Sequence, residues 1–443
     1  MRTILIIIAL LFAKQVKAQW QIGGNISATG FIYSQDELPF WLYSNTRARV
    51  SIDTDFTGHS SIYIDYLHNE DWTFKLQGGV FYENGYYRNL QMDELYAEIN
   101  YKDIELVVGR KQRKELYDGM SASDMNFAWS VNSRPIPGIQ FSMNEPFWIL
   151  RSKALGFELE WDEFFLEKTR YVSNARLHHK KLAFHYSKQG FKLSLGLDHY
   201  AQWAGTSPET GDQPEAVSDY FRVISGRGGG ENSVEGERQN ALGNHLAVYS
   251  AELSQDFNYL SVQLIYNHFF EDGSGSRFAN IPDGKYAINV SNRNPGAWWN
   301  AILYEFYYTK NQSKNSGGPQ DTDAYFNNFQ AYRSGWTYHN RIIGLPFFAF
   351  DASIPAVTND KFLAHHFGID SELKFIDSFP IQMKTKVSMV NYSDSSLENE
   401  QIYFSSSLSS QLKHFHVSLL IGADLSQPMH NSLGTGVQLS KSF

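Results

Sequence analysis

The sequence contains no cysteine, and beyond its first residues it contains no long hydrophobic run. The absence of cysteine among 443 residues excludes a disulfide framework, thiol chemistry and a lipid-modified cysteine anchor. No later stretch reaches 18 consecutive apolar residues, and the mean hydropathy is −0.39. A transmembrane helix is therefore not expected. The net charge of −9 argues against a nucleic-acid partner.

The N-terminal segment has the pattern of a secretory signal peptide. Arg2 precedes Ile4–Ala13, an apolar run of about ten residues that is too short to span a bilayer. Val16, Lys17 and Ala18 fit a small-x-small cleavage site. A buried N-terminal helix is the alternative, but this segment differs sharply from everything after it. We predict that residues 1–18 are a cleaved signal peptide and that residues 19–443 form one exported domain.

Aromatic residues distinguish the two exported classes, a soluble periplasmic protein and an outer-membrane β-barrel. They make up 15% of the chain, with 26 Tyr, 32 Phe and 10 Trp. Barrels need such residues at both membrane interfaces, and their mean hydropathy stays low because each strand faces lipid on one side only. Removing 18 of 443 residues leaves 425, enough for roughly 16 to 18 strands with turns and loops.

The dominant sequence period is two, as expected for strands with one face in lipid and one in a polar lumen. Apolar residues alternate with charged or polar ones in four clear segments, residues 47–56, 72–82, 191–197 and 262–270. We therefore predict an all-β fold, a transmembrane antiparallel up-and-down β-barrel.

Short turns and long loops alternate along the chain, as they do in outer-membrane barrels. Turns are expected at Asn84-Gly85 and at Asp103, and long loops near residues 111–152, 205–244, 273–296 and 311–346. Two segments inside these loops have helical spacing. Pro214 could begin a helix that reaches Ile224 and stops at Gly226, and residues 321–332 show a weaker pattern. Such helices would plug the lumen or lie in outer loops.

The last eleven residues read as a final lipid-facing strand. Val437, Leu439 and Phe443 share one face, and Phe443 is the last residue. A terminal aromatic resembles the signal that the barrel assembly machinery reads, although Lys441 stands where an apolar residue is usual. Outer-membrane lipid and this machinery are therefore expected partners, and the barrel is expected to be a monomer.

No residue set specific enough for catalysis or metal binding is found. His178-His179 and His365-His366 are adjacent pairs, and neighbours in a strand point to opposite faces, so neither pair can chelate one ion. The glycine-rich residues 226–230 lack the context of a phosphate loop, and no Gly-x-Ser-x-Gly elbow occurs. We expect no enzyme activity, no metal and no cofactor.

A mixture of aromatic, carboxylate, amide and guanidinium side chains suggests a carbohydrate-binding surface. Sugar rings stack on aromatic faces, and their hydroxyls bond to planar polar groups. The same mixture also makes an interfacial aromatic belt, so both interpretations stand. The candidate carbohydrate-binding residues are Asp198, His199, Tyr200, Gln202, Trp203, Asp219, Tyr220 and Arg222.

Several segments resemble a known family. Residues 130–137, SVNSRPIP, are similar to the S-x-N-A-x-P-I-P segment of Wzi-type capsule assembly proteins of Bacteroidetes-like genomes, with Ser133 in place of the usual alanine. Further similar segments follow in family order, residues 198–203, 240–245, 270–275 and 332–346. The resemblance spans about residues 90 to 350.

The resemblance implies a monomeric barrel of about eighteen strands, with helices plugging the periplasmic end and long loops closing the outer mouth. It implies a lectin-like protein that retains capsular or other exopolysaccharide at the cell surface, without enzyme activity. Binding residues do not carry over position by position.

The same sequence features are compatible with other functions. A porin or specific channel would use an open lumen, lined by Arg47, Arg49, Asp53 and Lys75. An outer-membrane hydrolase and a purely structural barrel are further alternatives. If residues 214–224 form a buried plug helix, replacing Phe221 with Asp should raise the conductance.

Overall fold

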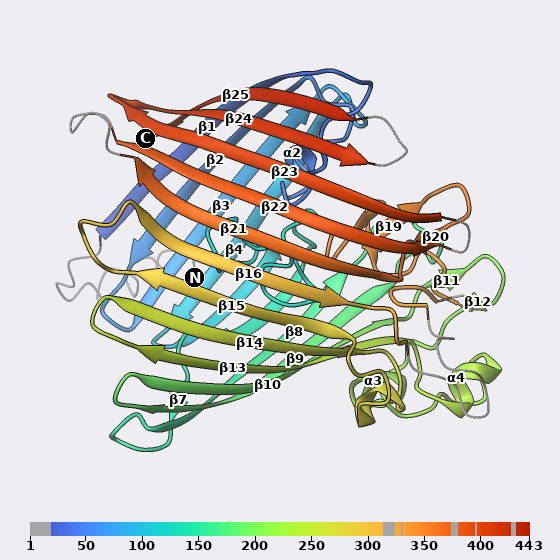
Figure 1. Ribbon diagram of the computed structural model, residues 1–443. Helices are drawn as coiled ribbons and strands as arrows, with labels where there is room; N and C mark the ends of the chain where they lie inside the picture. Colours follow the sequence, from blue (N-terminus) through green and yellow to red (C-terminus); the bar gives the residue numbers. More distant parts are fainter. Residues whose placement is uncertain (1–18, 313–323, 329–330, 374–379, 395–396, 427–430) are drawn as a thin grey trace, which may run out of the picture.

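The computed structural model describes residues 19–312, 324–328, 331–373, 380–394, 397–426 and 431–443. The predicted signal peptide, residues 1–18, lies outside the described residues. The chain forms one closed antiparallel barrel in which sequence neighbours pair and β1 pairs with β25 (Figure 1).

The sheet has 19 strands, and β6 and β7 both pair with β8 as consecutive parts of one stave, so the barrel has 18 staves. The strands are β1 (Gln19–Tyr33), β2 (Phe56–Leu67), β3 (Trp72–Glu83), β4 (Leu90–Tyr101), β5 (Ile104–Arg110), β6 (Gly138–Met143), β7 (Phe147–Trp148), β8 (Leu155–Phe165), β9 (Arg176–Lys188), β10 (Phe191–Trp203), β13 (Asn244–Asp256), β14 (Leu260–Phe270), β15 (Gly284–Asn292), β16 (Trp299–Tyr308), β21 (Phe362–Leu373), β22 (Ile381–Asp394), β23 (Leu397–Leu412), β24 (Phe415–Ser426) and β25 (Ser432–Ser442).

The two ends of the barrel differ in their connections. The turns at one end are short, such as residues 102–103 between β4 and β5 and residues 189–190 between β9 and β10. The opposite end carries the long connections, residues 34–55, 111–137, 204–243, 271–283 and 309–361. Because outer-membrane barrels place short turns in the periplasm and long loops outside, the long-connection end is the outer end.

The alternation of side chains follows the pleat, with lipid on one face and the lumen on the other. On β9 the even-numbered Leu182 and Phe184 are exposed on the outside, whereas the odd-numbered His179 and Lys181 face the lumen. The apolar faces that the alternation predicts for β3 and β10 are the faces that contact lipid, and Leu76 and Leu195 are exposed there.

A β-bulge in β4 interrupts this alternation and turns two consecutive carboxylates inward. The pairing register of β3 with β4 shifts between Gly78 and Val80, and Asp93 and Glu94 are both buried. A bulge adds one residue to a strand and re-aims the side chains beside it. Here it supplies two acceptors for segments that enter the lumen.

The outer half of the lumen is filled by a plug, which we define as the described parts of residues 34–55, 111–137 and 324–361. Its side chains pack on each other and on the inward faces of the wall strands. Phe127, for example, stacks on Phe269 of β14 at 4.8 Å between ring centroids, and Phe40 stacks on Tyr403 of β23 at 4.2 Å. The plug is therefore a hydrophobic core, enclosed by the barrel.

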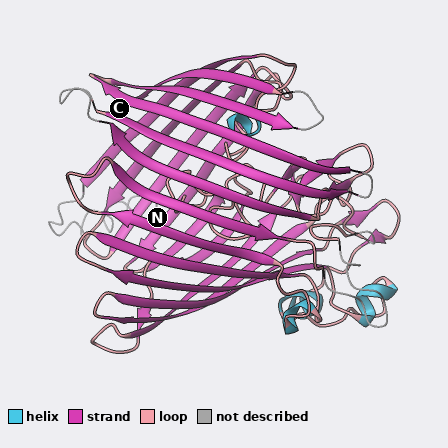
Figure 2. Cartoon of the chain, in the orientation of Figure 1, coloured by secondary structure: helices cyan, strands magenta, loops and turns pink. Residues whose placement is uncertain are grey.

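Small elements complete the fold, and Figure 2 shows how little of it is helical. Among the described residues, no helix is both long and apolar enough to cross a membrane. The elements are α2 (Phe40–Tyr43), β11 (Thr206–Ser207), β12 (Gly211–Asp212), α3 (Val217–Ile224), α4 (Glu235–Gln239), the 3-10 helix η1 (Gly275–Arg277), β17 (Thr337–Tyr338), β18 (Arg341–Ile342), β19 (Ala349–Asp351) and β20 (Ala356–Thr358).

Three sequence-based expectations about strands and loops are wrong. Residues 47–55 do not form a strand, because they belong to the plug, and β2 begins at Phe56. The expected loop at 111–152 contains β6 and β7, and that at 273–296 contains β15. These strands are short or begin at a glycine, so their alternation is weak.

The two expected helices have different outcomes. Residues 214–224 contain α3, but the helix begins at Val217 and not at Pro214, because Ala216 is extended and forms its N-cap. It ends at Ile224, and Gly226 with a φ of 61° follows as the predicted stop. Residues 324–328 are not helical, although residues 325–327 are buried, and part of the range 321–332 lies outside the described residues. In the described chain every helix belongs to a connection at the outer end, so the expected helices at the periplasmic end are not found there. Phe221 is exposed, so the expected effect of Phe221→Asp on conductance loses its basis.

We predict that Trp336→Ala loosens the plug. The Trp336 ring is fully buried, and its Nε1 donates a hydrogen bond to the Ala128 carbonyl at 2.6 Å. Loss of such a side chain costs about 3–5 kcal/mol. Hydrogen–deuterium exchange of residues 331–348 should accelerate, whereas Trp298→Ala, in an exposed turn, should change nothing. Equal exchange in both variants would contradict a packed plug.

Candidate functional site

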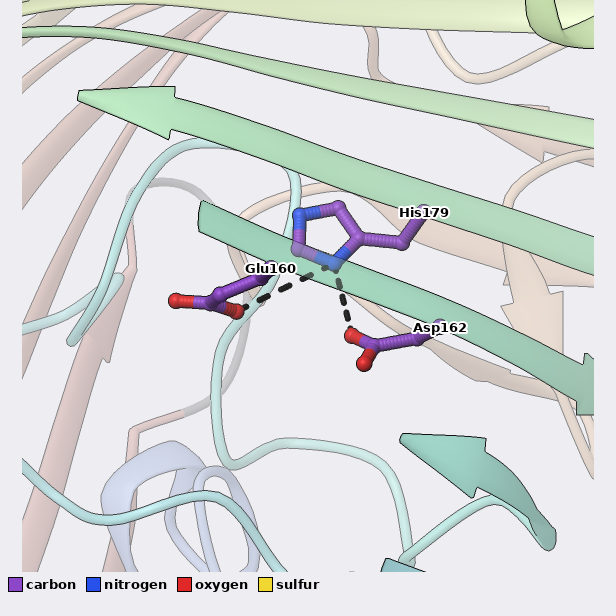
Figure 3. Close-up of side chains that lie close together, drawn as sticks. All are labelled: Glu160, Asp162 and His179. Atoms are coloured by element: carbon purple, nitrogen blue, oxygen red, sulfur yellow. Dashed lines mark hydrogen bonds and ion pairs between the residues drawn. The ribbon is translucent and has the colours of Figure 1, made fainter. Parts of the chain in front are cut away.

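A cluster of charged side chains lies in the lumen where β8 and β9 face the plug. Glu160 and Asp162 of β8 and His179 of β9 converge there (Figure 3). His179 Nδ1 lies 2.8 Å from Asp162 Oδ2 and 4.0 Å from Glu160 Oε2. His179 Nε2 lies 3.1 Å from Asp198 of β10. Carboxylates and imidazoles are common metal ligands, so the composition of this cluster is that of a metal site.

The plug supplies a cation to this cluster instead. Arg113 Nη2 lies 2.7 Å from Asp162 and 3.0 Å from His179 Nδ1, and its Nη1 lies 3.3 Å from Glu160. Lys181 of β9 pairs with Glu160 at 3.3 Å. Since buried carboxylates must be paired, the guanidinium neutralises the cluster and fixes residue 113 to the wall. We interpret the cluster as a plug anchor, in which an ion would have to displace Arg113.

Other wall carboxylates hold the plug in the same way. Glu83 at the end of β3 is fully buried and accepts hydrogen bonds from Ser51 and Thr54 of the plug, at 3.0 and 2.7 Å. Glu305 of β16 accepts from Ser121 Oγ and from the Ala122 amide, at 2.6 and 2.8 Å. Each carboxylate thereby satisfies backbone or hydroxyl donors that the lumen would otherwise leave without partners.

The bulge carboxylates add two more anchors. Asp93 accepts a hydrogen bond from Arg49 Nη2 of the plug at 2.5 Å, and Glu94 accepts one from the backbone N–H of Gln112 at 2.8 Å. Arg49 and Asp53 therefore do not line an open channel: Arg49 is ion-paired, and Asp53 lies in the plug segment. The wall of β3, β4, β8 and β16 thus fixes two of the inserted segments at several points.

The segment with the family-like sequence SVNSRPIP forms the centre of the plug. Ser130 Oγ donates to the Gly344 carbonyl at 2.7 Å, and Asn132 Nδ2 donates to the Ile342 carbonyl at 3.0 Å. Residue 344 must be a glycine, because a Cβ there would lie 2.5 Å from the Phe127 carbonyl oxygen. Two of the family-like segments, residues 130–137 and 332–346, therefore bind each other.

The structure separates the candidate carbohydrate-binding residues onto the two faces of the wall. Asp198, Tyr200 and Gln202 point into the lumen and are buried. Asn126 Nδ2 donates to the Tyr200 hydroxyl at 3.0 Å, and Gln202 Nε2 donates to the Gly335 carbonyl at 2.9 Å. Tyr200 and Gln202 contact the plug, and Asp198 lies 3.1 Å from His179 of the wall, so all three are out of reach of a ligand at the surface.

The remaining candidates lie on the outside of the barrel. His199 and Trp203 alternate with the buried three on β10, so they face outward. Trp203 contacts Tyr220 of α3, with ring centroids 5.2 Å apart. Arg222 pairs with Asp219 at 2.7 Å and is part-exposed. Because successive side chains of a strand point to opposite faces, residues 198–203 are divided between the lumen and the outside of the barrel.

A different set of polar and aromatic groups converges at the outer mouth. Tyr171 comes from the β8–β9 connection, Glu209 from the β11–β12 hairpin and Arg333 from the plug. Arg333 Nη2 lies 2.6 Å from Glu209, and its guanidinium lies 5.5 Å from the Tyr171 ring centre. We call these three residues the mouth cluster. Arg333 and Glu209 are each more than one third exposed.

The chemistry of the mouth cluster suits sugar hydroxyls. A tyrosine hydroxyl is a neutral donor at neutral pH, and desolvation, followed by a hydrogen bond to Glu209, raises the pKa of Tyr171 further. An aromatic ring, a planar cation and a carboxylate then lie side by side. Sequence reasoning missed this cluster because its members are separated by up to 162 positions and no periodicity joins them.

The sequence profile of the family described as capsule assembly protein Wzi matches residues 44–363, well over half of the chain. The chain belongs to the Wzi family. Family membership and the closed barrel together assign it to the outer membrane. The match includes the two plug segments that bind each other and stops at the start of β21. No curated protein sequence matches the chain.

Solved structures confirm the Wzi-type barrel. A structure described as Wzi of Escherichia coli, an outer-membrane protein involved in group 1 capsule assembly and a carbohydrate-binding β-barrel, is 11% identical. It has a TM-score of 0.60, with 94% of this chain and 83% of that chain covered. The Pseudomonas aeruginosa protein OpdO is 10% identical with a TM-score of 0.51, covering 95% and 97%. At these identities the likeness concerns the fold.

We predict that Arg113→Met weakens the Wzi-type plug by about 3 kcal/mol, because it leaves buried carboxylates without their main cation. Arg293→Met removes an exposed pair with Asp256 and should cost less than about 1 kcal/mol. Urea unfolding of the barrel in vesicles measures both. An Arg113 variant as stable as the Arg293 variant would argue against the anchor.

A pH-dependent element lies in the connection between β10 and β13. Glu237 of α4 is buried, and burial raises its pKa to about 7 despite a hydrogen bond from the Gly243 amide. Its Oε2 has no hydrogen-bond partner among the described residues. A carboxyl whose pKa rises on folding binds its proton more tightly in the folded state, so its stability contribution is complete at low pH.

We therefore predict that α4 loses stability as the pH rises from about 4.5 to about 7. Hydrogen–deuterium exchange of residues 228–243 should be slower at pH 5 than at pH 8 after correction for intrinsic exchange. Glu237→Gln, which stays neutral, should remove this difference. A pH dependence that persists in Glu237→Gln would assign it to another group.

Proposed function

We propose that this chain binds a surface polysaccharide at the outer mouth of its barrel and retains it at the cell surface. The observation that carries the proposal is the packed plug, in which side chains from three connections fill the outer half of the lumen. A ligand from outside therefore meets the mouth surface, where exposed aromatic and charged groups converge. The carbohydrate binding ascribed to the Escherichia coli Wzi structure supports the same assignment.

The mouth cluster is the proposed primary contact. The Tyr171 ring can stack on a sugar face, while Arg333 and Glu209 offer donors and acceptors to ring hydroxyls. From the sequence-based candidates, the Arg222–Asp219 pair is the part that keeps exposed polar atoms, and we propose it as a secondary contact. Asp198, Tyr200 and Gln202 contribute indirectly, by holding the plug that shapes the mouth.

A channel is the competing function, and the plug argues against it. Arg47 and Arg49, which would have lined an open lumen, lie in a plug segment, and Lys75 faces the inner half of the barrel. We expect the barrel to show little or no single-channel conductance in planar bilayers. Large, steady openings would instead support a porin.

We predict that Tyr171→Ala and Arg333→Ala each lower the retention of purified host surface polysaccharide on immobilised barrel. Loss of one stacking or bidentate contact should weaken binding roughly tenfold, or about 1.4 kcal/mol. Tyr259→Ala, an exposed tyrosine in a turn at the opposite end, is the matched control. If the control loses as much binding as Tyr171→Ala, the mouth cluster is not the site.

A further inference from the structure

The outward face of β8, β9, β10 and β13 changes from apolar to polar at one level. Below that level Phe184, Leu195 and Leu197 face the lipid and are exposed. Above it the cross-strand neighbours Glu163 and His178, and then Lys180 and His199, point outward. His178 Nδ1 lies 2.6 Å from Glu163, and His199 Nε2 lies 2.9 Å from His245 of β13.

Helix α3 covers this polar part of the outer wall. The Trp161 indole donates to the Tyr220 hydroxyl at 3.1 Å, and the Tyr220 ring lies 5.7 Å from the His178 ring. Val223 is fully buried in a cluster with outward-facing wall residues of β10. Lys180 Nζ donates to the carbonyl of Ile224, where the negative end of the helix dipole lies. The helix is therefore fixed to the outside of the barrel.

The connection between β14 and β15 does the same on the next strands. His268, outward on β14, lies 2.9 Å through its Nε2 from the Gly275 carbonyl, and its ring lies 4.6 Å from the Phe278 ring. Tyr286 of β15 donates to the Pro282 carbonyl at 3.0 Å. We call residues 214–243 and 271–283 the outer lip. Figure 1 shows α3 and α4 at the outer end, beside the wall.

The outer lip exposes apolar side chains on the surface that faces away from the wall. On α3, Val217 and Phe221 are four residues apart and are 75% and 60% exposed. On the second connection, Phe278 and Ile281 are 46% and 50% exposed. Residues at i and i+4 share one face of a helix. This apolar face continues the lipid-facing surface of Trp161, Leu182 and Phe184 directly below it.

We propose that the outer lip lies in the interface of the outer leaflet, with Val217, Phe221, Phe278 and Ile281 inserted among acyl chains. An amphipathic helix with an apolar face next to a hydrocarbon surface gains by burying that face in lipid. Its inner face meanwhile shields the outward Glu163, His178, Lys180 and His199 from the membrane. The occupant of the apolar face is lipid, because α3 is fixed to the outside of the wall whose Leu182 and Phe184 are exposed on the lipid face.

The absence of cysteine makes a site-specific test possible. Phe221→Cys, and Phe278→Cys as a second position, are labelled with an environment-sensitive nitrobenzoxadiazole dye. The barrel is reconstituted into phosphatidylcholine–phosphatidylglycerol vesicles that contain a lipid with a nitroxide near its headgroup. Phe184→Cys on the lipid face is the positive control. Ala352→Cys, in the exposed β19–β20 turn at the mouth, is the aqueous control.

The expected result is quenching of the labels at 221 and 278 by the nitroxide lipid, within about twofold of the label at 184. Iodide in solution should quench only the label at 352. Val217→Cys replaces Phe221→Cys if that variant does not fold. Labels at 221 and 278 that respond like the label at 352 would overturn the proposal. Iodide quenching in vesicles but protection in native outer membranes would also overturn it, in favour of a protein partner.

Discussion

The fold depends on carboxylates that the barrel wall presents to the plug in the outer half of its lumen. Glu83, Glu94, Glu160 and Glu305 point inward from four different strands, and a buried carboxylate is stable only when its oxygens are paired. The connections supply amides, hydroxyls and a guanidinium group from residues 51–54, 112–113 and 121–122. The wall itself adds Lys181 to Glu160 and Lys285 to Glu305. The wall and the plug therefore need each other. Without the plug the wall would need water or ions in its place, and the described parts of the inserted segments have only α2 and two short hairpins to satisfy their own backbone.

Much of the barrel could be predicted because period two follows directly from a wall between lipid and a polar lumen. The alternation in residues 72–82, 191–197 and 262–270 located β3, β10 and β14. The same rule failed at residues 47–55, where alternate apolar residues pack inside the lumen in an irregular segment. It also missed β6 and β15, since a strand that begins at Gly138 or Gly284 shows too few alternations to be recognised. Local periodicity shows which side chains avoid water. It does not show whether those side chains contact lipid or the plug.

The candidate site shows the same limit at the level of single residues. Asp198 to Trp203 look like one polar–aromatic surface in sequence, but a strand sends successive side chains to opposite faces. Period two, applied strictly to this segment, is enough to separate Asp198, Tyr200 and Gln202 from His199 and Trp203. The mouth cluster could not have been found in this way. Tyr171, Glu209 and Arg333 belong to three connections, and only the tertiary packing of the plug brings Arg333 beside the other two.

The connections at the outer end cover polar groups on both the lumenal and the outer face of the wall. Above the hydrocarbon level, both faces of the wall become polar, on the lumenal side through Asp162 and Asp198 and on the outer side through Glu163 and His199. Segments 111–137 and 324–361 fold inward and pair the lumenal groups, whereas residues 214–243 fold outward and cover the outer ones. Gln202 and Trp203, adjacent in β10, contact the plug and α3 respectively. Once both faces are covered, the exposed polar surface of this rim is the mouth between them. A polymer from outside would therefore meet the barrel at this surface, which both sets of connections hold in place.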